Sequence, residues 1–514
     1  MNGFSYITYI EYEAARLFTA VLLPQKEGRF PTVIFRTPYV QSMANRSDDE
    51  VEENALKIHM RWLERGYAVV FQHCRGQGKS TGAFVPYIHE REDGRMLREW
   101  IRKQPFYNGE IFLCGASYGA SLHYATAPFE EDIKGAVFEV QDSERYRLWY
   151  RNGQMRKGHA NWHFGLYKNK CGLNKNFSMD CFSQLPLVGL SRRVLQDEAA
   201  DFEQMLAAPS AAHPFWNTRA GGADARQATV DPGIPILFTT GYNDFYVGGM
   251  FRMWDAMPAS ARERCAMLVS PYDHGDTYSQ TDGMSFPDGR RSEQFGSAYP
   301  IDWLDHIRKG TPLPYRKGEI TYYRAFESGW SDSFYKTPTK PLAIPLGAKT
   351  AELRYDPLDP PAFCEEGKFL VSFNERRDVI TRYLPPAQRD VFVKGRMRAQ
   401  LTVSSNCPDT SFYMSISIKK PQGDYRLRHD ITSLSHQLGD YTPGQSAVLH
   451  FCFDEHAFLL GKGEQLRIDI APTDNNTYVC HTNQKGLYCL QDRTAIACNT
   501  VDLGRSEILL PIEE

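Results

Sequence analysis

A strand-like run that leads into Gly-x-Ser-x-Gly constrains the fold of this chain more than any other feature. Residues 111–114 are Ile-Phe-Leu-Cys, residues 115–119 are Gly-Ala-Ser-Tyr-Gly, and residues 120–127 are compatible with a helix. In such a strand-to-helix turn the serine adopts a strained conformation that exposes its hydroxyl, and the flanking glycines avoid collisions with nearby backbone. The pattern predicts a nucleophile elbow with Ser117 at its tip.

A second match to the same pattern lies at residues 78–82, Gly-Lys-Ser-Thr-Gly. The strand-like run at 67–72 ends well before this serine, and residues 83–87 contain a proline and no helical start. We therefore expect Ser80 to be a loop residue. The Gly-Lys-Ser sequence also resembles the end of a phosphate-binding loop, but that motif requires a glycine where His73 stands, so a nucleotide site is excluded.

Composition limits the classes of protein that this chain can be. Its 514 residues, 42% hydrophobic and 24% charged, can form two or three hydrophobic cores. A net charge of −3 gives no basic surface for nucleic acid. No apolar run approaches the roughly 20 residues that cross a bilayer, and no basic segment followed by an apolar one marks a signal peptide. We expect neither a nucleic-acid partner nor a membrane partner.

The cysteine pattern bears on metals and on cellular compartment. The 11 cysteines include no C-x-x-C pair and no Cys/His cluster with zinc-like spacing. A structural zinc site is therefore not expected. Several cysteines stand in apolar runs, where a buried free thiol is the ordinary interpretation. Together these features favour a reducing, cytoplasmic setting.

Strand-like and helix-like segments alternate up to about residue 142. The expected strands are 16–23, 32–35, 67–72, 111–114 and 135–140, and the expected helices are 50–65, 93–103 and 120–127. Such alternation, with short glycine-rich turns, predicts a mainly parallel α/β sheet covered by helices on both faces and joined by right-handed crossovers.

The alternation stops at residues 143–229, which are rich in Arg, Asn, Trp, Tyr and His and contain helical fragments such as 191–207. An insertion here would lie over the carboxyl edge of the sheet, where open α/β sheets bind ligands, so we interpret it as a helical cap. The sheet pattern then resumes. Its expected elements are a strand at 235–240, a helix at 249–256, a strand at 265–270 and a closing helix at 298–308.

Beyond about residue 315 short strand-like runs recur between turn residues, and no long helix is visible. These runs are 319–325, 397–403, 412–418, 447–453 and 465–470. The pattern predicts an all-β sandwich. A proline-rich segment at 355–361 is expected to be a rigid connector.

Two polar residues follow consecutive predicted strands at the sheet edge that carries the elbow. Asp244 follows the strand at 235–240, and His274 follows the strand at 265–270. A serine hydroxyl needs a base within hydrogen-bond reach, and the base needs a group that orients it. The chain order Ser117, Asp244, His274 is the order of an α/β-hydrolase triad.

Each of these residues also has an ordinary structural interpretation. Asp244 alone could form a turn or cap a helix, and Asp273 or Asp276 could form a local turn or compete for the imidazole of His274. The joint pattern favours the triad. In it Ser117 attacks, His274 transfers the proton, and Asp244 holds the tautomer.

The oxyanion of the tetrahedral intermediate needs hydrogen-bond donors. One is expected from the backbone N–H of Tyr118, the residue after the nucleophile. The loop at 36–39, Arg-Thr-Pro-Tyr, has no glycine run to offer backbone amides, so the hydroxyl of Tyr39 is a candidate for the second donor. From the residues alone the interpretation of Tyr39 as a packing aromatic is favoured, since it is one of 28 tyrosines.

The chain resembles the X-prolyl dipeptidyl-peptidase and cocaine-esterase-like hydrolases, also called CocE/NonD hydrolases. The resemblance runs over nearly the whole length and keeps a common order of motifs. These stand at 36–39, 75–82, 115–119, 241–244, 355–360, 409–412 and 461–463.

The resemblance implies an α/β-hydrolase domain at 1–142 and 230–314, a helical cap at 143–229 and a jelly-roll domain at 315–514. It also implies that Tyr39 supplies the oxyanion hydroxyl. Family members cleave esters or amides, including Xaa-Pro dipeptides and α-amino acid esters, without a cofactor, and many are dimers or larger.

The sequence departs from the family pattern in three places. The first hairpin lacks its usual Asp-Gly turn, His73-Cys74 replaces a common Asp-Thr pair, and the cap diverges. The leading hypothesis is a serine hydrolase that cleaves a small-molecule ester, an amide or a short peptide through an acyl-enzyme. A broad carboxylesterase or acylase specificity is favoured over strict X-prolyl or α-amino acid ester specificity, because no carboxylate pocket for a substrate amino group is visible in the cap. Acyl transfer to an alcohol or amine and an inactive binding or scaffold member are the alternatives.

Overall fold

A computed structural model describes most of the chain, in two compact units. The described residues are 3–171, 179–195, 199–218, 231–276, 284–332, 334–364, 368–372 and 376–514. Parts of the predicted cap, at 172–178, 196–198 and 219–229, lie outside them. The first unit comprises 1–145, 214–270 and 290–321, and the second comprises 146–213, 271–289 and 322–514.

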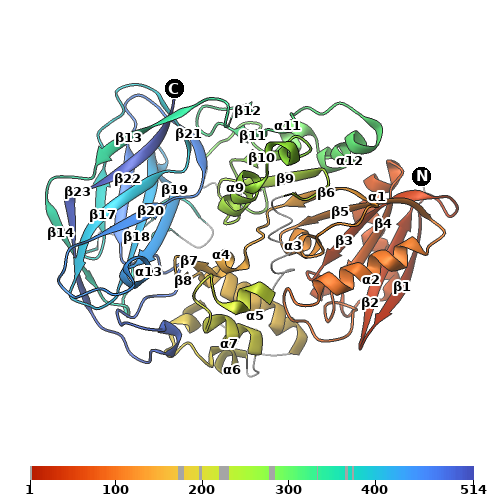
Figure 1. Ribbon diagram of the computed structural model, residues 1–514, viewed down its shortest axis with the longest axis horizontal. Coiled ribbons are helices and arrows are strands. Elements are labelled where there is room, and N and C mark those ends of the chain that lie inside the picture. Colours follow the sequence, from red (N-terminus) through yellow and green to blue (C-terminus); the bar gives the residue numbers. More distant parts are fainter. Residues whose placement is uncertain are drawn as a thin grey trace. The chain divides into compact units, whose positions relative to one another are not determined.

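The first unit is built on a mainly parallel sheet with the order β1-β2-β4-β3-β5-β6-β9-β10-β11 (Figure 1). Its strands are β1 (Phe4–Tyr12), β2 (Ala15–Leu23), β3 (Phe30–Thr37), β4 (Ala68–His73), β5 (Tyr107–Ala116), β6 (Ile133–Glu139), β9 (Ile236–Gly241), β10 (Ala266–Ser270) and β11 (Ile320–Tyr323). All pairings from β4 to β10 are parallel, whereas β1 and β2 form an antiparallel hairpin whose second strand pairs antiparallel with β4. The α/β fold class predicted from the alternation is confirmed.

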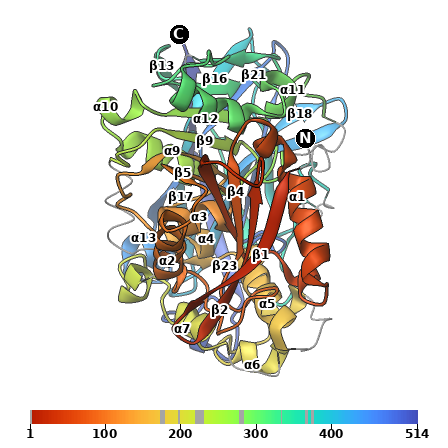
Figure 2. The same cartoon turned by 90° about the vertical axis from the view of Figure 1, so that its right-hand side faces the viewer.

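Helices cover both faces of this sheet, as buried parallel strands require. They are α1 (Asp48–Glu64), α2 (Glu90–Arg102), α3 (Tyr118–Tyr124), α9 (Val247–Ala256), α10 (Ala259–Arg262), α11 (Arg291–Phe295) and α12 (Tyr299–Lys309). Figure 2 shows α1 on one side of the strands and α2 and α3 on the other. A capping box between Ser47 and Glu50 begins α1 two residues before the predicted start.

The second unit contains two antiparallel sheets. The larger has the order β20-β17-β23-β16-β21, with β13 and β14 also paired to β23, and the smaller has the order β15-β22-β18-β19. Their strands are β13 (Thr339–Pro345), β14 (Thr350–Tyr355), β15 (Ile380–Tyr383), β16 (Val391–Gly395), β17 (Arg398–Ser405), β18 (Ser411–Lys420), β19 (Gly423–Ser433), β20 (Ala447–Cys452), β21 (His456–Leu460), β22 (Leu466–Ala471) and β23 (Ala497–Glu513). A short helix, α13 (Leu434–Leu438), follows β19.

One hydrophobic core joins these two sheets. The larger sheet contributes Val393, Leu401, Leu449, Phe458 and Ile508, and the smaller contributes Ile380, Ile416, Leu427 and Ile468. This is the face-to-face packing of a β-sandwich, so the mostly β C-terminal region is confirmed, and its jelly-roll connectivity stays a prediction. The run at 319–325 is not part of this sandwich, because it forms β11 of the first sheet. The last residues of β11 pair with β12 (Trp330–Ser331).

The segment at 146–213 belongs to the second unit. Its described elements are α4 (Arg145–Trp149), the hairpin β7 (Tyr150–Arg151) and β8 (Gln154–Met155), α5 (Lys157–Cys171), α6 (Leu190–Leu195) and α7 (Ala200–Leu206). Arg151 ties the hairpin to the β-rich part, because its guanidinium lies 2.7 Å from Asp430 and 2.9 Å from Asp454. The backbone N–H of Val479 also donates to the carbonyl of Met155 at 2.9 Å.

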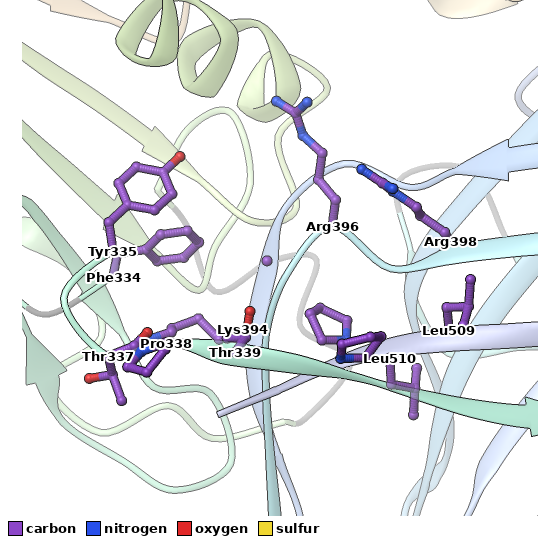
Figure 3. A pocket seen from close by; sticks show the side chains of 13 residues that line it. Phe334, Tyr335, Thr337, Pro338, Thr339, Lys394, Arg396, Arg398, Leu509 and Leu510 are labelled. Atoms are coloured by element: carbon purple, nitrogen blue, oxygen red, sulfur yellow. The ribbon is translucent and has the colours of Figure 1, made fainter. Parts of the chain in front are cut away.

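A surface pocket of about 460 Å³ lies in the second unit, between β16, the end of β23 and the segment before β13. Figure 3 shows the rings of Phe334 and Tyr335 on one side of it and Arg396 and Arg398 on the other. Lys394 in its wall lies 2.8 Å from Glu513, and Arg396 pairs with Glu455. Lys394 and Arg396 therefore already have counter-ions within the chain.

Among the described residues, no helix is long and apolar enough to cross a membrane. In the same part of the chain, no three or more His, Cys, Asp or Glu side chains are grouped so that they could hold a metal ion. The ten cysteines whose side chains the structure describes are free, and seven of them are buried.

Candidate active site

Ser117 occupies the turn between β5 and α3. Its backbone has φ 56° and ψ −124°, a strained conformation for a residue with a side chain. Its N–H donates to the carbonyl of Glu139 on β6 at 2.9 Å, and its carbonyl accepts from the N–H and Oγ of Ser121, each at 3.0 Å. The strand, turn and helix predicted around Ser117 are all present. These hydrogen bonds to β6 and within α3 hold the strained backbone in place.

Close contacts with neighbouring backbone explain why glycines flank Ser117 in the elbow. A Cβ on Gly115 would lie 2.5 Å from the backbone C and O of Gly119, which is closer than non-bonded atoms approach. A Cβ on Gly119 would lie 3.1 Å from the carbonyl oxygen of Arg36. The helix after the serine passes so close to the strand before it that only glycine fits at position 115.

Tyr39, two residues beyond β3, points its hydroxyl at the elbow. The distance from Tyr39 Oη to Ser117 Oγ is 3.5 Å, although 78 residues separate them in the chain. The side chain is 44% exposed, which is unlike a packing aromatic. Its backbone N–H donates to Thr37 Oγ1 at 3.0 Å, which helps to set the direction of the loop.

A buried network holds the side chain of Tyr118. Its hydroxyl donates to Glu90 and accepts from the N–H of Tyr87 at 2.9 Å. Glu90 lies 3.5 Å from the Arg36 guanidinium, which also donates to the Glu90 carbonyl at 2.9 Å. Burial raises the pKa of the Glu90 carboxyl, and Arg36 and the Tyr118 hydroxyl oppose that rise. Tyr118 is thereby tied to the structure beneath the elbow, which restrains its backbone beside Ser117.

Ser80, the serine of the second Gly-x-Ser-x-Gly match, has a structural role. It is a loop residue, as predicted, and its Oγ donates to the His73 carbonyl and accepts from the Phe18 N–H, both at 2.9 Å. The ring of His73 accepts from the N–H of Lys79 at 3.2 Å, and burial lowers the pKa of His73 to about 3. A neutral histidine therefore organises this loop.

Asp244 lies just beyond the carboxyl end of β9 and is 3% exposed. Its Oδ1 accepts from the N–H of Tyr246 at 2.9 Å. Burial raises the pKa of Tyr246 well above its usual value; Tyr87, Tyr39 and Asp244 add to the rise, and Arg145 opposes it. Asp244 and Tyr39 therefore lie in one electrostatic neighbourhood, on elements far apart in sequence.

His274 follows β10, as predicted, and belongs to the second unit, whereas Ser117 and Asp244 belong to the first. It is half-buried. Asp273 Oδ1 accepts from the N–H of Gly275 at 3.2 Å, so this carboxylate takes part in a local turn. The assembly of Ser117, Asp244 and His274 into one triad stays a prediction.

Aromatic residues anchor the described stretches on either side of 277–283, namely 271–276, which carries His274, and 284–289. The ring of Phe286 contacts those of Tyr323, Phe326 and Tyr425, with centroids 5.4 to 6.3 Å apart. Three side chains donate to backbone carbonyls of the segment: Tyr272 to Phe286 at 3.1 Å, Tyr323 to Pro287 at 2.9 Å and Trp330 to Asp288 at 2.7 Å. These contacts escaped the sequence analysis because no local pattern links residue 286 to a strand some 140 residues later.

A strained serine between a parallel strand and a helix, with a tyrosine hydroxyl beside it, defines the class of serine hydrolases with an α/β-hydrolase-type fold. The matches to known families agree with that class. The chain belongs to the X-Pro dipeptidyl-peptidase (S15) family, whose model matches residues 13–276. The model of the X-Pro dipeptidyl-peptidase C-terminal non-catalytic domain matches residues 321–507.

Individual relatives match along nearly the full length of the chain. Cocaine esterase from Rhodococcus sp. (strain MB1 Bresler) is 23% identical over 592 aligned positions, covering 97% of this chain and 96% of the relative. An α-amino acid ester hydrolase structure has a TM-score of 0.82 at 16% identity, covering 99% and 97% of the two chains. An aminopeptidase from a marine sediment Thaumarchaeota archaeon has a TM-score of 0.80 at 16% identity, covering 100% and 97%.

These matches confirm the resemblance found from the sequence motifs, and the two structures show the shared fold. The chain is a serine-type hydrolase of ester or peptide bonds.

Proposed function

We propose that Ser117 is the nucleophile of a cofactor-independent hydrolase in which His274 is the general base and Asp244 orients the imidazole. The observation that carries the proposal is the 3.5 Å approach of Tyr39 Oη to Ser117 Oγ at a strained elbow. A hydroxyl at this distance from the nucleophile can reach the oxygen of a carbonyl that the serine attacks.

The reaction follows from these roles. Ser117 Oγ adds to the carbonyl carbon of the ester or amide while its proton passes to His274. The N–H of Tyr118 and the hydroxyl of Tyr39 donate to the oxyanion. His274 then protonates the departing alcohol or amine, which leaves an acyl group on Ser117. Water then adds to this acyl carbon while His274 takes its proton. The bond between the acyl carbon and Ser117 Oγ breaks, His274 returns the proton to Ser117 Oγ, and the acid is released.

Carboxylesterase or acylase breadth fits this site better than strict cleavage after Xaa-Pro. Recognition of a substrate ammonium group needs available carboxylates, and the described acidic residues between 199 and 213 are engaged within the chain. Asp201 lies 3.1 Å from His163, and Glu203 accepts from the N–H of Gly189 at 2.6 Å and from Ser191 Oγ at 2.6 Å. X-prolyl dipeptidyl-peptidase or α-amino acid ester hydrolase specificity is the second candidate, favoured by the family and by the relatives' names.

Labelling with a fluorophosphonate tests the nucleophile. We expect one adduct, on Ser117, that Ser117→Ala abolishes and Ser80→Ala leaves intact. A folded protein without an adduct on Ser117 would instead support an inactive binding or scaffold protein. Product analysis with an added alcohol or amine separates acyl transfer from hydrolysis.

Kinetics on paired substrates test the specificity. We expect kcat/KM to be higher for p-nitrophenyl esters than for Xaa-Pro-p-nitroanilides, and the reverse order would establish the X-prolyl alternative. The cytoplasmic setting and a dimeric assembly are part of the same proposal, and light scattering of the purified protein tests the latter.

A further inference from the structure

Arg145, at the start of α4, is a buried arginine without a counter-ion. It is 3% exposed, yet no ion pair among the described residues includes it. Within the same described part of the chain, its Nε and Nη1 have no hydrogen-bond partner. Burial of an unpaired charge is strongly unfavourable, so an arginine in this state indicates a partner that comes from outside the chain.

The contacts of Arg145 place it beside the elbow. Its Cζ lies 4.7 Å from the ring centre of Tyr87, and the Tyr87 ring lies 4.5 Å from that of Tyr118, the residue after the nucleophile. Burial raises the pKa of the Tyr87 hydroxyl, and Arg145 opposes the rise by its charge and by a hydrogen bond. The face of a neutral phenol attracts a cation but does not replace a carboxylate.

Three carboxylates of the first unit already have partners of their own. Asp142 lies 2.8 Å from the Arg252 guanidinium, and Glu90 is engaged by Arg36 and by Tyr118. Asp244 accepts from the N–H of Tyr246 and is assigned above to His274. None of the three is left to neutralise Arg145.

We propose that Arg145 binds a carboxylate of the substrate, so that the preferred esters or amides carry a negative charge near the scissile bond. The inference rests on the proposed function, because it takes Ser117 as the nucleophile. Arg145 influences Tyr246 together with Tyr39 and Asp244, which places its charge in the neighbourhood of the reacting serine. A guanidinium with unbonded N–H donors suits a carboxylate in both charge and hydrogen bonding.

Two pairs of substrates test the proposal and locate the carboxylate. Monomethyl glutarate and its neutral isostere methyl glutaramate differ in the acyl part. Butyryloxyacetate and butyryloxyacetamide differ in the leaving group. Hydrolysis is followed by titration of the released acid. Because a charged hydrogen bond is worth about 1.5 to 3 kcal/mol, we expect the wild-type enzyme to prefer the anion in one pair by about 10- to 150-fold in kcat/KM.

Variants assign this preference to Arg145. Arg145→Leu should reduce the ratio to about one, and Arg145→Lys should retain part of it because the charge remains. Arg147→Leu is the matched control, since Arg147 lies on the same helix and is exposed, and it should leave the ratio unchanged. If Arg145→Leu does not fold, competition on the wild-type enzyme replaces it: glutarate should slow the labelling of Ser117 at concentrations at which the uncharged diamide, glutaramide, does not.

Absence of an anion preference in both pairs, with Ser117 still labelled, would overturn the inference and leave the proposed function intact. A preference that survives in Arg145→Leu would overturn it as well. Failure to label Ser117 would instead overturn the proposed function itself.

Discussion

Replacement of Tyr39 by phenylalanine removes one hydroxyl and nothing else from the site. Loss of one oxyanion donor should lower kcat about 10- to 1000-fold, which corresponds to about 1.4 to 4 kcal/mol of transition-state stabilisation. The Oη of Tyr39 lies 3.5 Å from Ser117 Oγ, so a donor role in the transition state is sterically accessible. KM should change much less, because the ground-state carbonyl does not carry the full charge.

Stability serves as the control for this variant. The Tyr39 side chain is 44% exposed, so loss of its hydroxyl should change the free energy of unfolding by less than about 0.5 kcal/mol. The assay is the hydrolysis of a p-nitrophenyl ester, with thermal denaturation of both proteins measured in parallel. A folded Tyr39→Phe protein with wild-type kcat would refute the argument and remove Tyr39 from the oxyanion hole.

Four further substitutions test structural and catalytic roles. Ser80→Ala should keep activity but lower the free energy of unfolding, measured by urea denaturation, by about 1 to 3 kcal/mol, because it leaves a buried N–H without its acceptor. Ser117→Ala should instead lose activity and keep its stability. Equal loss of activity in both variants would contradict these assignments. Phe286→Ala should lower the free energy of unfolding by about 3 to 5 kcal/mol and slow the labelling of Ser117 below its melting temperature, because the ring anchors the segment that carries His274; labelling at the wild-type rate would show that the anchor is not needed. His73 has a folded pKa of about 3, below its usual value of 6.5, so its stabilising contribution is present above pH 6.5 and is lost as the pH falls toward 3. When the pH is lowered from 7 to 5, the free energy of unfolding of the wild type should fall by about 2 kcal/mol more than that of His73→Asn. If the free energies of unfolding of the two proteins change in parallel with pH, this histidine is not buried in its neutral form.

Much of the fold could be predicted because the relevant signals are local. The elbow is encoded within ten residues, where a strand-like run, two glycines and a helix-compatible run agree. Asp244 and His274 could be located after their strands because parallel strands bring their carboxyl ends to one edge of a sheet. The C-terminal sandwich was predictable from short runs between turn residues, although β11 went to the other sheet, since a four-residue apolar run does not specify its partner.

Other features depend on contacts between distant parts of the chain. The longest strand, β23, pairs with β13, β14, β16 and β17, and no local period in its sequence indicates those partners. The aromatic contacts of Phe286 likewise join residues from different parts of the C-terminal half.

The sequence by itself determined the strand-turn-helix elbow around Ser117, the α/β class, the β-rich C-terminal region and the family, because strand period, turn chemistry and motif order are properties of neighbouring residues. Only the tertiary structure distinguished Tyr39 from 27 other tyrosines and showed Arg145 to be buried without a counter-ion. Proximity across 78 residues and the absence of a charge partner are properties of packing, and no segment of the chain carries them alone.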